Sequence, residues 1–318
     1  QVHEQMRGLP GVMRGIEKAF PNFPEYVVYP SAILGINRNA GGDYREVLPV
    51  ESHPSQFDAA RFYDHFRRSF SRFYRRMADM GFTIVNMCYP MSVDDAEAES
   101  GLAVYAATST DRIIRFTRAE KVQLFSALLA TVPEYRQQIR IFTPLTSVLS
   151  LVRQYQERQE QDDRRGYGCR GGVDFFFVNS TDGNTYPCGY RGHENLGKFW
   201  DLEIDKINPA SNCTDCDWEC FRDPSEMAGP LIELPRSPLR VVRRFRADAE
   251  YAKHWRRDVK YYRACDFFCG RRDIDRGRLA KFAVEGAPPH VATTTSSAAE
   301  TRDSAEAESE QREMAAVG

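Results

Sequence analysis

The sequence predicts an α/β fold class in its first half, followed by a smaller cysteine-rich region. Short apolar segments alternate there with amphipathic stretches of ten or more residues, a pattern typical of parallel βαβ units. Seven of the eight cysteines then fall between residues 169 and 269. We place two domains at residues 1–160 and 166–283, separated by a charged, glycine-containing stretch. Residues 286–318 are rich in Ala, Ser, Thr and Glu and are predicted to form a disordered tail.

The clearest helix of the first domain is predicted at residues 56–80. Its apolar residues follow helical spacing and form one stripe, and a glycine, Gly81, follows at the end: the stripe is Phe62, Phe66, Phe70, Phe73, Met77 and Met80. A stripe with this spacing is typical of a helix that faces a core. Further helices are predicted at 10–20, 118–131 and 145–159, and strands at 26–36, 82–89 and 139–142. Three strands are too few for a complete barrel or a doubly wound sheet, so we expect the chain to enter a fold part-way.

The second domain is predicted to begin with a β-hairpin. Residues 174–178 and 185–188 flank an Asp-Gly turn signal, Asp182-Gly183. A loop punctuated by glycines follows at 190–200, and the basic residues 239–262 are predicted to be helical.

The cysteines have the spacing of metal ligands. Cys169 and Cys188 flank the hairpin, which brings two distant ligands to one site, and a tight run and a closing pair follow them: Cys213, Cys216 and Cys220, then Cys265 and Cys269. Each short spacing directs two thiolates at one centre, so we predict a metal site. The alternatives are a zinc site and a disulfide scaffold, which suits small secreted domains. No signal peptide or membrane-spanning apolar run is visible, so we expect a cytoplasmic protein with no membrane partner.

A family resemblance rests on these spacings. Thirteen residues separate Cys169 from Gly183, four separate Gly183 from Cys188, and a C-x-x-C pair follows at Cys213 and Cys216. This pattern, with a leucine–glycine segment at 194–199, resembles the auxiliary-cluster domain of radical SAM enzymes, called SPASM or, when shortened, Twitch. Residues 3–11 (HEQMRGLPG) are similar to the segment after the fourth strand of a radical SAM barrel.

The resemblance implies a partial (β/α)6 radical SAM barrel joined to a SPASM-like domain that binds one or two auxiliary 4Fe–4S clusters. The implied metal ligands are the seven clustered cysteines: Cys169, Cys188, Cys213, Cys216, Cys220, Cys265 and Cys269. A Twitch-like arrangement places the first four on one cluster. The two-site arrangement, which we favour slightly, places the run 213–220 on a second cluster and leaves one position without cysteine.

The chain departs from the family pattern in two ways. The C-x-x-x-C-x-x-C motif that holds the SAM-cleaving cluster is absent from the sequence, so we expect S-adenosyl-L-methionine (SAM) and its own 4Fe–4S cluster in a full-length parent and no activity from this chain alone. The spacing from Cys216 to Cys220 is also shorter than in the full SPASM pattern. The resemblance further implies a peptide, protein or small-molecule substrate and an electron donor such as flavodoxin or ferredoxin. It assigns no catalytic residue.

The net charge of −2 conceals a strong local asymmetry. Residues 236–281 contain fifteen Lys and Arg against six Asp and Glu. Such a surface attracts phosphate, nucleic acid or acidic peptide, and a set of solvated helix arginines is the simpler interpretation. A zinc-bearing nucleic-acid-binding protein is therefore the alternative function. The sequence has no recognisable nucleic-acid-binding module, so nucleic acid is the less favoured partner.

Four further residues near the cysteines carry weaker predictions. Cys88 lies in a predicted strand and is expected to be a structural core residue. His193 is a candidate ligand or hydrogen-bond donor to the metal site, and Trp218 and Tyr190 are candidates to shield it.

Overall fold

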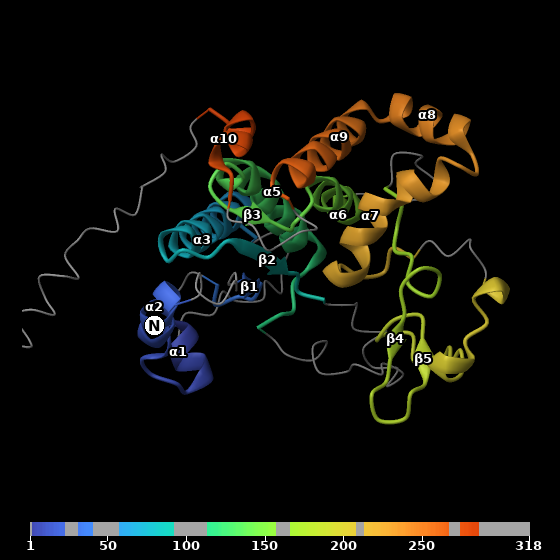
Figure 1. Ribbon diagram of the computed structural model, residues 1–318, viewed down its shortest axis with the longest axis horizontal. Coiled ribbons are helices and arrows are strands. Elements are labelled where there is room, and N and C mark those ends of the chain that lie inside the picture. Colours follow the sequence, from blue (N-terminus) through green and yellow to red (C-terminus); the bar gives the residue numbers. More distant parts are fainter. Residues whose placement is uncertain are drawn as a thin grey trace, which may run out of the picture. The chain divides into compact units, whose positions relative to one another are not determined.

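The computed structural model describes residues 2–22, 31–40, 57–91, 113–156, 166–207, 213–266 and 274–285 (Figure 1). These residues all belong to one compact unit, Gln1–Ala287. The predicted tail at 286–318 and the predicted ligand Cys269 lie outside the described residues. The proposed domain boundary between residues 160 and 166 also lies in a stretch that is not described, and it stays a prediction.

A three-stranded parallel sheet forms the centre of the first half. It consists of β1 (Ser31–Gly35), β2 (Ile84–Cys88) and β3 (Arg140–Ile141) in the order β1-β2-β3. Ser31 lies opposite Ile84, and Ile84 lies opposite Arg140. The predicted parallel pairing is therefore confirmed for the described strands, whereas the partial barrel stays a prediction.

Helices follow and connect these strands. Those of the first half are α1 (Val2–Arg7), α2 (Val12–Ala19), α3 (Ala59–Asp79), α5 (Arg118–Tyr135) and α6 (Leu145–Gln156). α5 packs against both α3 and α6. It begins with a capping box, in which Thr117 accepts from the backbone amide of Glu120 and Glu120 accepts from that of Thr117. The Glu120 carboxylate also binds Arg38, and both side chains are fully buried.

The apolar stripe of α3 faces the core, as its spacing predicted. Phe66 and Phe70 are fully buried, and they belong to the same hydrophobic cluster as Val85 from β2 and Leu128 from α5. The sequence-based interpretation of the stripe as core is confirmed. Burial of each such large side chain contributes about 1.5–3 kcal/mol to folding.

The predicted hairpin is also present. β4 (Phe177–Val178) pairs antiparallel with β5 (Thr185–Tyr186) across the glycine turn. Gly183 has a φ of +74°, and a Cβ at this position would lie 2.7 Å from the Trp200 ring, so only glycine fits. Two short 3-10 helices follow, η4 (Phe199–Asp201) and η5 (Ile204–Lys206).

Helices account for most of the remaining second half. Cys220, the last cysteine of the tight run, lies in the first turn of α7 (Glu219–Glu233). The prediction that residues 239–262 are helical is confirmed, and they form two helices, α8 (Pro238–Ala247) and α9 (Ala249–Ala264). The helices break at Asp248, whose carboxylate accepts from the Tyr251 amide and caps α9. The described fold ends with α10 (Arg276–Leu279) and η6 (Ala280–Phe282).

Buried polar contacts join α9 to the sheet half. The Arg136 guanidinium lies 2.6 Å from the Asp258 carboxylate, and both side chains are fully buried. The Tyr261 hydroxyl donates to the Ile139 carbonyl and accepts from the Ile141 amide, at 2.8 and 2.9 Å. None of the described helices has the length and apolarity required to span a membrane.

Candidate metal centre

Four of the predicted ligands lie in one hydrophobic cluster. Cys169 and Cys216 are buried, and Cys188 and Cys213 are partly buried beside them. Trp218 and Phe221 complete the buried part of this cluster, with Phe175, Phe177, Met91 and Tyr190 packed against it. We call these four cysteines the four-thiol site.

Backbone pairing brings the four-thiol site together. The Cys169 amide donates to the Cys213 carbonyl at 2.8 Å, in an isolated antiparallel bridge between segments 44 positions apart. The hairpin then returns the chain so that Pro187, the residue before Cys188, lies against Gly172. Gly172 has a φ of +82°, and a Cβ there would lie 2.7 Å from the Pro187 Cβ. This approach therefore requires glycine.

Each sulfur of the four-thiol site accepts a backbone hydrogen bond from the residue two positions later. The Gly171 amide donates to the Cys169 Sγ at 3.3 Å. The other three donors are the amides of Tyr190 to Cys188, Asp215 to Cys213 and Trp218 to Cys216. A backbone N–H stabilises the charged form of the sulfur that it binds, so these amides favour the thiolate. At Cys213 the Asp215 carboxylate opposes this effect, because it accepts a hydrogen bond from the thiol at 3.0 Å.

Burial opposes ionisation of these thiols when no metal is bound. It raises the pKa of Cys213 to about 12, and it raises the pKa values of Cys169, Cys188 and Cys216 above the ordinary range. Two arginines act in the other direction. Arg222, fully buried in α7, lowers the pKa of Cys169, and Arg191 lowers those of Cys169 and Cys188. A cation among the sulfurs would offset the cost of burial and release the protons.

Among the described residues, no group of three or more His, Cys, Asp or Glu side chains is placed so that it could hold a metal ion. The four thiols share a hydrophobic cluster, and their binding of a metal or of an iron–sulfur cluster stays a prediction. The seven cysteines within the described ranges are all free thiols, so the disulfide alternative has no support there.

The remaining predicted ligands lie elsewhere. Cys220 is exposed on α7. Cys265, at the end of α9, is buried in a different hydrophobic cluster with Tyr261, Tyr262, Leu279 and Phe282. The structure therefore does not bring Cys220 or Cys265 into the four-thiol site, and their role as ligands stays a prediction.

A second group of reactive side chains was missed by the sequence analysis. Cys88, at the carboxyl end of β2, lies beside Glu219 and Cys220 from the first turn of α7. The Cys220 Sγ lies 3.6 Å from the Glu219 carboxylate, and the Tyr89 amide donates to the same carboxylate at 3.2 Å. Burial raises the pKa of Glu219, of Cys88 and, to about 11, of Cys220. Cys88 is thus half-buried beside polar groups, not a simple core residue.

Glu219 and Cys220 also line a cavity of about 500 Å³ at the carboxyl ends of β2 and β3. Its other walls come from Asn86 of β2, from the segment after β3, and from α7 and α9: Phe142, Pro144, Asp223, Pro224, Met227, Ala228, Leu231, Val259, Tyr262 and Arg263. Burial raises the pKa of Asp223 far above its usual range. Ligands of parallel α/β sheets bind at this edge, which is the signal that could have drawn attention to Cys88.

The other residues singled out near the cysteines have mixed placements. Trp218 lies in the hydrophobic cluster of the four-thiol site, and its ring centroid is 5.6 Å from that of Tyr190. Trp218 and Tyr190 therefore both lie beside the thiols that they are predicted to shield. His193 is more than half exposed and lies 3.3 Å from the Glu194 carboxylate. Its role as a ligand or hydrogen-bond donor at the metal site stays a prediction.

In comparisons with known proteins, no family model matches the chain, and no curated protein or solved structure matches it. The likeness to radical SAM enzymes therefore remains a resemblance carried by the cysteine spacing. The functional assignment depends on the chain's own residues.

Proposed function

We propose that the four-thiol site binds one auxiliary 4Fe–4S cluster and that the chain serves in a radical SAM enzyme. The observation that carries the proposal is the repeated amide donor. Each of four cysteines in one hydrophobic cluster accepts a hydrogen bond from the amide two residues later. Protein thiolates that hold iron–sulfur clusters are tuned by such hydrogen bonds and by burial.

The residues present fit such a group. Cys169, Cys188, Cys213 and Cys216 would hold it, and when bound it would relay electrons or anchor a substrate. Trp218 and Phe221 are buried in the same hydrophobic cluster as the cysteines and would help to shield a bound group. Arg222 and Arg191 place positive charge near them, which favours the anionic state of the ligands.

The cavity at the strand ends is the proposed substrate region. α7 connects it to the four-thiol site, because Cys216 lies just before the helix and Glu219 and Cys220 lie in its first turn. Burial raises the pKa of Asp223, which favours its neutral form, and the lining is otherwise largely apolar. These properties suit an apolar group of a peptide, protein or small-molecule substrate. The proposal also includes SAM with its own cluster, an electron donor that resembles flavodoxin or ferredoxin, and a partial barrel.

The proposal is tested by reconstituting the chain with iron and sulfide without oxygen. We expect a brown protein with broad visible absorption that disappears in Cys169→Ser and in Cys216→Ser. Cys265→Ser is the matched control, because Cys265 is equally buried but lies outside the four-thiol site. Loss of the absorption in Cys265→Ser but not in Cys216→Ser would refute the ligand assignment. Zinc bound without sulfide would favour the alternative, a zinc-bearing nucleic-acid-binding protein.

A further inference from the structure

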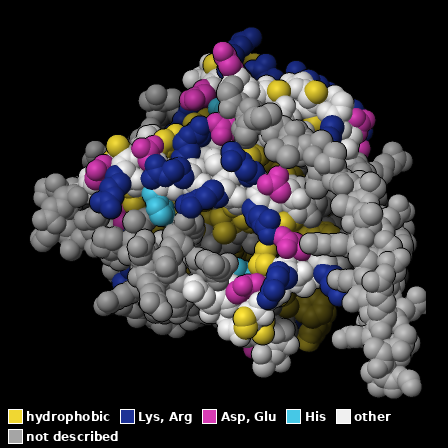
Figure 2. Space-filling view, turned by 90° about the vertical axis from the view of Figure 1, so that its left-hand side faces the viewer, with side chains coloured by type: hydrophobic (Ala, Val, Ile, Leu, Met, Phe, Trp, Pro, Cys, Tyr) yellow, Lys and Arg dark blue, Asp and Glu magenta, His cyan; other side chains and the backbone are white. Residues whose placement is uncertain are grey.

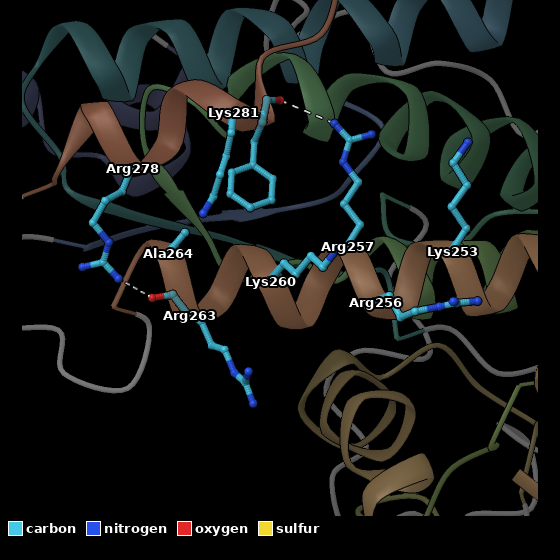
Figure 3. Close-up of a pocket in the computed structure, with 9 residues that line it drawn as sticks. Lys253, Arg256, Arg257, Lys260, Arg263, Ala264, Arg278 and Lys281 are labelled. Carbon is cyan, nitrogen blue, oxygen red and sulfur yellow. Dashed lines mark hydrogen bonds between the residues drawn. The ribbon is translucent and has the colours of Figure 1, made fainter. Parts of the chain in front are cut away.

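A basic groove lies between α9 and the segment formed by α10 and η6 (Figure 3). It has a volume of about 910 Å³, and the described residues that line it include seven cationic side chains and no acidic one: Lys253, Arg256, Arg257, Lys260, Arg263, Arg278 and Lys281. Figure 3 shows that the two walls face each other, with Lys281 directed from η6 toward α9. Seven of the fifteen cations of residues 236–281 therefore line this one groove.

The acidic residues of α9 do not neutralise this groove. Asp258 binds Arg136 on the buried side of the helix, and Glu250 binds Arg153 at 2.7 Å. Within the described part of the chain, only one groove cation is in an ion pair, Arg278, which lies 2.7 Å from Asp266. The cations of α9 therefore face the groove without carboxylate partners among the described residues.

Arg257 lies in an environment that disfavours its charge. Its guanidinium donates to the Phe282 carbonyl at 3.4 Å across the groove. Burial lowers its pKa and the positive charge of Arg136 lowers it further, whereas Asp258 acts in the opposite direction. An anion in the groove would relieve this unfavourable environment.

The groove cations form a row of defined length. Lys253, Arg256, Lys260 and Arg263 are spaced by three, four and three residues, which places them on one face of α9. At about 1.5 Å per residue the row is about 15 Å long. An extended chain rises about 3.3 Å per residue, so four or five residues of extended polypeptide span the row.

We propose that this groove binds an acidic, extended segment of a partner polypeptide. Asp and Glu carboxylates of the segment form charge-assisted hydrogen bonds with the arginines and lysines. Among the described residues that line the groove, the one aromatic side chain, Phe282, is buried, so none of them offers an exposed ring to stack on a base. The inference does not depend on the metal centre; if both hold, the partner is the substrate peptide or protein.

A second arginine-rich surface on α3 provides a matched control. Arg67, Arg68, Arg72 and Arg75 line a cavity of about 530 Å³ together with Asp64. Figure 2 views the molecule from the side on which α3 lies in Figure 1, and Lys and Arg side chains are prominent there. This surface differs from the groove because it contains a carboxylate, and because Arg67 is paired with Glu134.

The test measures binding of a fluorescent hexaglutamate peptide by anisotropy at low and at physiological salt. The groove variant is Arg256→Glu with Lys260→Glu, and the control is Arg68→Glu with Arg75→Glu. All four positions are exposed and helical, so glutamate is tolerated. We expect the groove variant to weaken binding at least tenfold and the control to change it less than twofold.

Two results would overturn the proposal. Equal weakening by both variants would show attraction to the overall charge only. Binding of a single-stranded oligonucleotide with no binding of hexaglutamate would assign the groove to nucleic acid. Because the measurement needs no iron, its outcome is independent of the outcome for the metal centre.

Discussion

The backbone amide of Cys169 donates a 2.8 Å hydrogen bond to the carbonyl of Cys213. This one contact ties the cysteine that precedes the hairpin to the C-x-x-C run that follows it. It aligns two segments whose side chains then share one hydrophobic cluster with Cys188 and Cys216. The candidate metal site is therefore built on backbone pairing, and loss of that pairing has predictable consequences.

Gly172→Ala should separate the two sides of the four-thiol site. The added Cβ would lie 2.7 Å from Pro187 at a φ of +82°, so the contact must open. We expect at least twofold less iron per chain after reconstitution and a loss of about 2 kcal/mol in the free energy of unfolding. Gly15→Ala is the control, because it lies in α2 with no atom within 4 Å of its Cβ, and it should be neutral or stabilising. Equal iron content in both variants would contradict the packing argument.

Loading of the four-thiol site should depend steeply on pH. Burial raises the pKa of Cys213 to about 12 and raises those of its three neighbours, so each thiol must lose a proton when metal binds. Metal binding is therefore favoured as the pH rises. Between about pH 6.5 and 8.5 the apparent affinity for ferrous iron, measured by competition with a chelator, should increase at least tenfold. Loading that is independent of pH would exclude these thiols as the ligands.

The buried pair of Arg222 and Glu226 should be essential for stability. Both side chains are almost fully buried at a separation of 3.5 Å. Arg222→Met leaves an unpaired buried carboxylate and should cost about 3–5 kcal/mol of unfolding free energy in denaturant titrations. Adding Glu226→Gln should recover part of this loss. Arg240→Met, which removes a largely exposed partner of Glu233, should cost less than about 1 kcal/mol. A similar cost for both single variants would show that burial of the first pair is unimportant.

Asp223→Asn should alter the pH dependence of stability. Burial raises the pKa of Asp223 in the folded protein, so its contribution is full at pH values below the unfolded pKa and is lost as the pH rises. Above about pH 4 the wild type should therefore lose up to about 1.4 kcal/mol per pH unit relative to the variant, until the folded pKa is reached. The Tyr89 hydroxyl lies 3.1 Å from the Asp223 carboxyl and remains able to donate to the amide oxygen. A stability difference that is constant from pH 4 to 8 would indicate an ionised Asp223.

Sequence periodicity predicted the elements whose signal is local. The α3 stripe, the hairpin at Gly183 and the three strands all carry patterns that need no tertiary information. α7 was missed because Pro224 and Pro230 lie inside it and suggest a loop. Contacts that form only in the folded protein stabilise this helix, including those of the fully buried Glu226.

The candidate site was predictable in part. Cysteine spacing selected seven candidate ligands, and the set of four that shares one hydrophobic cluster is the set that the Twitch-like arrangement implied. The approach of Cys88 to Glu219 joins positions 131 residues apart, and no local pattern contains it. The same holds for the groove, where the spacing on α9 is visible in the sequence but the opposing wall of α10 and η6 is not.

The most direct test of the central claim is the content of iron, acid-labile sulfide and zinc per chain after purification without oxygen. One 4Fe–4S cluster on the four-thiol site predicts about four iron and about four sulfide per chain, with little zinc. The same assay on Cys188→Ser should show a large loss of both. About eight iron would contradict a single cluster, and zinc without sulfide would contradict the iron–sulfur assignment altogether.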